Sequence, residues 1–389
     1  MDHANQEELT CSISCFFGCY STVNCEKGRQ QGRKISCNRW YKDDEQVASY
    51  IIHHYHECMS APAPPPTMQD SFSIPKQIHF IWFGPRPIPR HVDAQVFPQN
   101  KAKTQGQDGK YWNECSRSWK MHHSTEDGWS HKLWNEASME QLHAKHEPSC
   151  ECMATLRRGY SYALNIKNYG MASDIARLEI LYIYGGLYVD FDYYCFRSIS
   201  DLHQSYDFYC GASNSGSIEV NNGLIGCKKD HFLIVDLIKS ISRWFSNFQH
   251  FSCIDNQGLQ LSRDLQKEST LPSSLMSSFL DDQSLLSFRQ VQKNVTSMQV
   301  IENTGPGLLT KSIFKFFHQH VSAKRDDEER SFGRIIVLPA SAFHPLPNNQ
   351  RHHVNDHISD DELFAEIINN VIDSDLTRAV HLWSCSWQS

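Results

Sequence analysis

The chain has 389 residues, enough to bury a large core in one big or two medium domains. Its 37 basic and 44 acidic residues leave a net charge of -7. This charge argues against a nucleic-acid partner, because proteins that bind nucleic acids favour a basic footprint. No apolar run approaches the roughly 20 residues of a membrane-spanning helix. The N-terminus lacks a basic start followed by an apolar stretch, so no signal peptide is expected.

The first part of the chain, residues 1–73, reads as a cysteine-rich and partly disordered N-terminal extension. Polar residues dominate it, and the proline-rich stretch 61–66 is typical of a semi-rigid linker. Five of the 14 cysteines gather near the start, namely Cys11, Cys15, Cys19, Cys25 and Cys37. Together with Cys58 and nearby histidines they could bind zinc, although their spacing is wider than in a zinc finger. Disulfides and unbonded thiols are the alternatives, and the role of these cysteines stays open.

The folded part is predicted to span residues 74–389 and to alternate strands with helices. Residues 77–83 read as a strand, and four tryptophans between 100 and 150 suggest packed pieces rather than disorder. Residues 168–184 read as a helix with one apolar stripe, ended by a glycine pair. Further strands are expected at 207–211, 218–227 and 334–338, and further helices at 230–245, 308–318 and 360–372. This alternation predicts an α/β fold with a mostly parallel central sheet, whose ligands bind beyond the carboxyl ends of the strands.

The segment Tyr184–Asp192 is the strongest local signal in the chain. It reads Tyr-Gly-Gly-Leu-Tyr-Val-Asp-Phe-Asp, an apolar run closed by two aspartates. Along a strand alternate residues share a face, so Tyr188, Asp190 and Asp192 would lie together. Two carboxylates at a strand end suit hard cations such as Mg²⁺ or Mn²⁺. The alternative is a solvated strand end, since a bare Asp-x-Asp occurs by chance in many proteins.

A second pair of charged residues lies on the predicted helix just before this segment. Asp174 and Arg177 are three positions apart, so their side chains are neighbours on the helix surface. One interpretation is a surface ion pair of little energetic weight. The other is that both face the same pocket as the two aspartates, where they could bind substrate hydroxyls or phosphate.

These motifs, taken with others, resemble the DXD-motif glycosyltransferases. That group includes yeast-type α-mannosyltransferases, inositol-phosphoceramide mannosyltransferases, α1,4-glycosyltransferases and the clostridial glucosylating toxins. The matching blocks occur in the family's order, at 74–82, 174–177, 184–192, 221–226, 304–310, 379–383 and 386–387. The segment from about 100 to 165 matches no block of the family.

The resemblance implies a GT-A fold, a Rossmann-like nucleotide-binding half joined to an acceptor half, with a metal site. Asp190 would contact ribose and metal, Asp192 would bind the metal directly, and His381 would complete the coordination. The ion would be Mn²⁺ or Mg²⁺. Such an ion stabilises the negative charge that develops on a departing sugar diphosphate.

The same resemblance implies roles for residues that bind the donor. Trp82 would stack on the nucleobase, and Tyr188 would line the nucleotide-sugar pocket. Asp174 and Arg177 would bind the donor sugar, with Asn222 near the anomeric carbon. Ser386 and Trp387 would form a C-terminal flap over the diphosphate.

The implied function is metal-dependent, retaining transfer of a hexose from a UDP- or GDP-sugar to a glycan or glycolipid acceptor. Mannosyl transfer is slightly preferred. The alternatives are an inactive protein that binds nucleotide sugars or glycans, and a toxin-like glucosyltransferase that modifies a protein. The lack of a leader or membrane span favours a cytoplasmic location, whereas the family resemblance favours the Golgi.

Overall fold

The computed structural model describes residues 13–18, 44–60, 73–86, 108–247, 295–322, 334–350, 369–370, 372 and 375–384. Most of the helix predicted at 360–372 and the whole predicted flap, Ser386 and Trp387, lie outside these residues.

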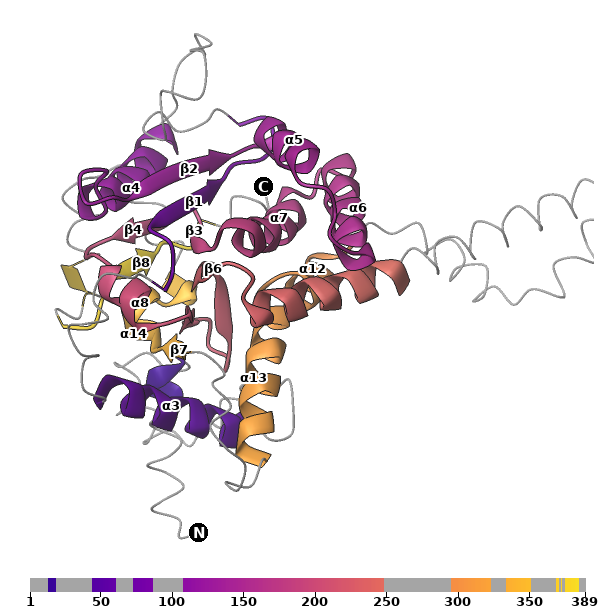
Figure 1. The fold of residues 1–389 in the computed structure, drawn as a ribbon. Helices are drawn as coiled ribbons and strands as arrows, with labels where there is room; N and C mark the ends of the chain where they lie inside the picture. Colours follow the sequence, from indigo (N-terminus) through magenta and orange to yellow (C-terminus); the bar gives the residue numbers. More distant parts are fainter. Residues whose placement is uncertain are drawn as a thin grey trace, which may run out of the picture.

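A six-stranded sheet forms the centre of the molecule (Figure 1). Its strands, in spatial order, are β2 (Ser130–Trp134), β1 (Gln77–Ile81), β3 (Gly186–Val189), β6 (Val220–Cys227), β5 (Phe208–Ala212) and β7 (Ile335–Leu338). Among these described strands only β6 runs antiparallel to its neighbours, β3 and β5. Every residue of β3, β5 and β7 is buried, as expected for a sheet covered on both faces. The predicted α/β fold with a mostly parallel sheet is confirmed.

The helices lie around this sheet, and a small second sheet lies beside it (Figure 1). The longer helices are α4 (Asp108–His122), α5 (Glu136–Lys145), α6 (Glu151–Asn165), α7 (Tyr169–Tyr184), a helix at 232–247, α12 (Ser297–Asn303) and α13 (Pro306–Ser322). Shorter helices are α8 (Ser200–Ser205), α14 (Ala340–Phe343) and the 3₁₀ turn η2 (Asn348–Gln350). The second sheet pairs β4 (Tyr193–Cys195) with β8 (Ala379–His381). The predicted strands, and the helices at 168–184, 230–245 and 308–318, are confirmed. The four tryptophans of the 100–150 region are buried, so that region is packed.

Helix α3 (Asp44–Ser60) lies within the predicted N-terminal extension, yet it packs onto the body of the molecule. It contacts α13 and β7, and α13 lies beside it in Figure 1. Val47 and Ile51 are buried in the common core, and His54 Nε2 lies 2.8 Å from the carbonyl oxygen of Ile335. A domain boundary at residue 73 stays a prediction, but α3 is not structurally separate from the body that carries the central sheet.

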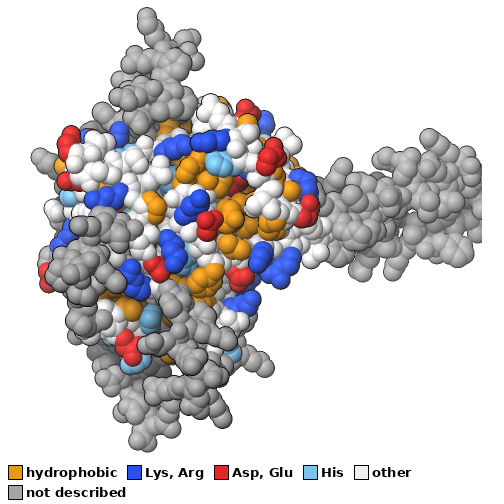
Figure 2. Space-filling view, viewed as in Figure 1, with side chains coloured by type: hydrophobic (Ala, Val, Ile, Leu, Met, Phe, Trp, Pro, Cys, Tyr) orange, Lys and Arg blue, Asp and Glu red, His pale blue; other side chains and the backbone are white. Residues whose placement is uncertain are grey.

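Charged side chains of both signs share the face of the molecule seen in Figure 2, where basic and acidic groups are interspersed. Within the described residues no helix combines the length and the apolar character that crossing a membrane requires.

The junction between α7 and β3 depends on its glycine pair. Gly185 and Gly186 have φ angles of +66° and +94°, in a region that favours glycine. A Cβ atom on Gly186 would lie 2.5 Å from the carbonyl oxygen of Gln77 in the neighbouring strand β1. These glycines therefore let the chain turn sharply from the end of α7 into β3.

We expect Gly186→Ala to destabilise the fold strongly. The backbone strain and the close contact with Gln77 together should lower the free energy of unfolding by roughly 3 kcal/mol, as measured by urea denaturation. Gly128→Ala is the matched control, because Gly128 has a φ of +81° but nothing within 4 Å of its Cβ position. Equal losses in both variants would show that the contact with Gln77 does not demand glycine.

Candidate active site at the carboxyl end of strand β3

The sheet topology brings distant segments together at one edge. Strands β1 and β3 are parallel, so Trp82 and Asp190 follow strands that end on the same side. Strand β6 runs the opposite way and begins there, and the Asp190 N–H donates to the Gly223 carbonyl at 2.8 Å. The start of β6, with Asn221 and Asn222, therefore lies beside the end of β3.

Three candidate metal ligands converge at this edge. Asp190, Asp192 and His381 each offer one atom, and these atoms lie within 4.8 Å of one another. The His381 Nε2 atom is 3.3 Å from Asp192 Oδ1. Over the described ranges this is the only set of three or more His, Cys, Asp or Glu side chains with such an arrangement. The two carboxylates suit a hard ion such as Mn²⁺ or Mg²⁺, and the imidazole nitrogen makes the set fit Mn²⁺ better than Mg²⁺.

Hydrogen bonds and burial shift the pKa values of Asp190 and Asp192 in opposite directions. Burial acts to raise the pKa of Asp192, but His381 and the Ser384 donors outweigh it, so the pKa lies below its usual value. The Ser384 N–H and hydroxyl both donate to Asp192 Oδ2, at 2.9 Å each. Burial raises the pKa of Asp190 although Arg177 opposes the shift. A divalent cation at this point would favour the ionised form of both.

The strand that carries Asp190 is shorter than the sequence pattern predicts. Strand β3 ends at Val189, and residues 191–192 form a turn. The prediction that alternation along one strand places both aspartates on one face is therefore wrong for Asp192. The turn sends the chain into β4, where pairing with β8 brings Asp192 back toward Asp190 and beside His381.

Arg177 links the helix α7 to the aspartate motif. Its Nη2 atom is 3.0 Å from Asp174 Oδ1 and 3.6 Å from Asp190 Oδ1. Its Nη1 donates to the Asn222 carbonyl at 2.6 Å, and its guanidinium carbon lies 4.3 Å from the centre of the Tyr188 ring. The Arg177 and Asp174 side chains are only 5% and 10% exposed, so the alternative of a solvated surface pair is wrong.

Tyr188 and Asp190 share a face of β3, as their spacing predicts. The Tyr188 hydroxyl donates to Asp190 Oδ1, which leaves the second carboxylate oxygen of Asp190 available for another partner. The Tyr188 side chain is buried, so its hydroxyl serves to orient this carboxylate.

Thr304 is a residue of this site that sequence reasoning missed. Its hydroxyl donates to Asp174 Oδ2 at 3.0 Å, while the Asn222 side-chain amide donates to Asp174 Oδ1 at 2.9 Å. A small cavity lies against this network, lined by Asp174, Arg177, Asn222 and Thr304 together with apolar side chains. The Thr-Gly-Pro-Gly block at 304–307 was the available signal, but only the fold shows that its threonine fixes the Asp174 carboxylate.

Trp82 lies at the edge of the site and is packed edge-on. Its ring makes T-shaped contacts with Phe191 and Trp112, at centroid distances of 5.0 and 5.5 Å. Its indole N–H donates to the Arg86 carbonyl at 3.0 Å, and the residue is only 9% exposed. Stacking on a nucleobase stays a prediction. At the other side of the site, Ser384 is the last described residue before the predicted flap.

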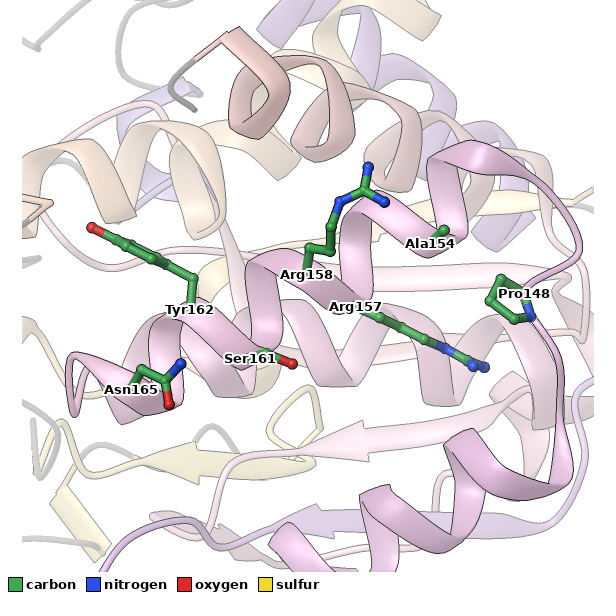
Figure 3. A pocket seen from close by; sticks show the side chains of 7 residues that line it. All are labelled: Pro148, Ala154, Arg157, Arg158, Ser161, Tyr162 and Asn165. Atoms are coloured by element: carbon green, nitrogen blue, oxygen red, sulfur yellow. The ribbon is translucent and has the colours of Figure 1, made fainter. Parts of the chain in front are cut away.

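A separate surface hollow of about 470 Å³ lies along α6 (Figure 3). Seven residues line it, namely Pro148, Ala154, Arg157, Arg158, Ser161, Tyr162 and Asn165. The Arg157 Nε donates to Glu179 Oε1 at 2.8 Å, so this arginine is already engaged in holding α6 to α7. The hollow shares no residue with the carboxylate cluster.

Comparison with known proteins covers the two aspartates of the cluster but not His381. Residues 109–209 match the family described as the glycosyltransferase sugar-binding region containing DXD motif. The match includes Asp174, Arg177, Asp190 and Asp192. Over these residues the chain is similar to a DXD-type glycosyltransferase sugar-binding region. The expectation that residues 100–165 lie outside any family block is wrong, because most of that segment falls inside the match.

A curated relative agrees with this assignment over a limited length. Inositol phosphoceramide mannosyltransferase 3 of Schizosaccharomyces pombe (strain 972 / ATCC 24843) is 30% identical over 119 residues. These residues make up 31% of the present chain and 30% of the relative.

Solved structures overlap this chain only loosely. PaToxG glycosyltransferase is 13% identical, with 70% of this chain and 77% of that chain covered and a TM-score of 0.37. The ligand-free glycosyltransferase domain from the YGT toxin is 12% identical, with 77% and 89% covered and a TM-score of 0.36. Overlaps of this quality carry no weight for the function of the present chain.

We expect Gly223→Ala to displace the Asp190 carboxylate. A Cβ atom at this position would lie 2.6 Å from Asp190 Oδ2 and 2.9 Å from both Asn221 Oδ1 and the Tyr193 hydroxyl. Affinity for Mn²⁺, measured by electron paramagnetic resonance, should fall about tenfold or more, as for other changes to the surroundings of a metal ligand.

Gly159→Ala is the control for this variant, because its Cβ position meets only side chains at 3.4 Å or more. It should leave Mn²⁺ affinity unchanged. If Gly223→Ala binds Mn²⁺ as the unmodified protein does, the ion does not depend on the position of Asp190.

Proposed function

We propose that this chain is a metal-dependent glycosyltransferase with a GT-A fold that transfers a hexose from a UDP- or GDP-sugar, with retention of anomeric configuration. The observation that carries the proposal is the convergence of Asp190, Asp192 and His381 beside the buried Asp174–Arg177 pair. The match to a DXD sugar-binding region supports it independently.

Asp190, Asp192 and His381 are the residues that would hold the ion. A bound Mn²⁺ or Mg²⁺ would neutralise the charge that develops on the departing nucleoside diphosphate. The protein contributes the positions of these ligands. Ser384 fixes one oxygen of Asp192, and Tyr188 fixes one oxygen of Asp190, so neither carboxylate has to reorganise when the ion binds.

Asp174, Arg177 and Asn222 are the residues proposed to bind the donor sugar. Because their side chains are locked to one another and to Thr304, they would present hydroxyl partners in a fixed geometry. The Asp174 carboxylate shares Arg177 with Asp190, and from this position it would orient the sugar or stabilise positive charge at the anomeric carbon. In a retaining transferase the leaving phosphate can accept the acceptor's proton, so this proposal assigns no protein base.

The proposed sugar and acceptor rest on the similarity to the Schizosaccharomyces pombe relative. A mannosyltransferase named for inositol phosphoceramide favours mannosyl transfer and a lipid or glycan acceptor. A nucleotide-sugar-binding protein without turnover, and a toxin-like enzyme that glucosylates a protein, are the competing outcomes.

A donor panel tests the proposal most directly. The purified chain is incubated with Mn²⁺ and UDP-glucose, UDP-galactose, UDP-N-acetylglucosamine or GDP-mannose, and release of the nucleoside diphosphate is followed with and without glycan and lipid acceptors. We expect one donor to be consumed, most readily GDP-mannose, and a chelator to stop the reaction. Binding of a donor with no turnover under any condition would favour the inactive binding protein.

We expect Asp192→Asn to abolish transfer without unfolding the chain. The amide keeps the shape of the side chain and can still accept from Ser384, but it loses the charge that a cation requires. Turnover should fall to background at saturating Mn²⁺, while the thermal unfolding midpoint changes little. The exposed Asp230→Asn is the control and should be fully active. An active Asp192→Asn would remove Asp192 from the set of metal ligands.

A further inference from the structure

We propose that Tyr193 is a positioning residue that holds the His381 imidazole in the plane needed to present Nε2 to the carboxylate cluster. This inference rests on the metal site of the proposed function. Tyr193 is fully buried and is not one of the three candidate ligands, so we expect its effect to pass through His381.

The ring of His381 lacks the usual second anchor. A histidine that binds a metal almost always donates its other ring N–H to a carbonyl, carboxylate or water, which fixes the ring orientation. The His381 Nδ1 atom is buried and has no hydrogen-bond partner among the described residues. The contact of Nε2 with Asp192 Oδ1, at 3.3 Å, leaves the ring free to turn about that direction, so ring packing has to set the plane of this imidazole.

Ring stacking supplies that orientation. Tyr193 and His381 are register partners across β4 and β8, and their rings stack with centroids 4.3 Å apart and planes 6° from parallel. Trp383 makes a second contact with the imidazole at 4.2 Å and 40°. The Trp383 indole is in turn held by its bond to the Leu346 carbonyl, at 2.8 Å.

The Tyr193 ring is itself anchored from several elements. Its hydroxyl donates to Asn221 Oδ1 at 3.2 Å and lies 2.7 Å from His344 Nε2. Its carbonyl accepts from the Trp119 indole at 2.9 Å. The tyrosine thus connects β6, the end of α14 and helix α4 to a single face of His381.

The experiment uses the full chain and Mn²⁺ alone, with no donor sugar. Affinity is measured by electron paramagnetic resonance, and a bound imidazole is detected from the ¹⁴N coupling in the electron spin echo. Tyr193→Leu should weaken Mn²⁺ binding about 10- to 100-fold and diminish the ¹⁴N coupling. Tyr193→Phe keeps the stacked ring and loses its anchors, so it should give an intermediate affinity.

Two further variants separate positioning from general packing. Tyr194→Leu, at the next position, removes a tyrosine that packs against Phe196 and should leave Mn²⁺ binding unchanged. In a His381→Ala background, Tyr193→Leu should cause no additional loss, because the residue acts only through the imidazole.

Two results would overturn the inference while leaving the proposed function intact. The first is that a folded Tyr193→Leu variant has the same Mn²⁺ affinity and the same ¹⁴N coupling as the unmodified protein. The second is that Tyr193→Leu lowers Mn²⁺ affinity equally in the presence and in the absence of His381. If Tyr193→Leu does not fold, an unchanged Tyr193→Phe counts against the inference. An unmodified protein that binds no Mn²⁺ would refute the metal site, and the inference with it.

Discussion

The site depends on one buried cation, the guanidinium of Arg177. It lies between Asp174 on its own helix, the Tyr188 ring and Asp190 at the end of β3, and the Asn222 carbonyl on β6. A buried charge is costly unless it is paired and hydrogen-bonded, so removing either carboxylate would weaken the compensation of this charge in the core. Arg177 therefore holds helix α7 and strands β3 and β6 in one relative position, and this position brings Asp174 and Asp190 to the same cation.

The aspartate motif is completed by segments remote from it in sequence. Ser384 donates hydrogen bonds to the Asp192 carboxylate, and His381 contacts the same carboxylate from β8. Strand β8 is formed by its pairing with β4. The same pairing stacks Tyr193 on His381. Residues 381–384 thus supply a candidate metal ligand, His381, and the donors that hold Asp192, while β4 supplies the tyrosine that stacks on the imidazole. A metal site assembled this way would depend on the pairing of β4 with β8.

Much of the framework could be predicted from local patterns. The helix 168–184 follows from its apolar stripe and its glycine end, and the buried strands follow from short apolar runs between turn signals. The alternation of apolar and polar residues predicts that this strand continues to Asp192, whereas β3 ends at Val189. Thr304 and His344 were missed as site residues because their contacts, with Asp174 and Tyr193, join positions more than a hundred residues apart. No spacing rule reaches that far.

The sequence by itself determined which chemistry is available: two aspartates after a buried strand, an Asp–Arg pair one helical turn apart, and a glycine pair that joins them. These signals are local, because propensity, periodicity and turn chemistry act over a few residues. Only the tertiary structure decided that the Asp174–Arg177 pair is buried rather than solvated, and that His381 faces Asp192. It alone also placed the Tyr193 ring parallel to the His381 imidazole, with ring centroids 4.3 Å apart. Burial and non-local pairing are properties of the packed chain, and they set both the charge and the geometry of the site.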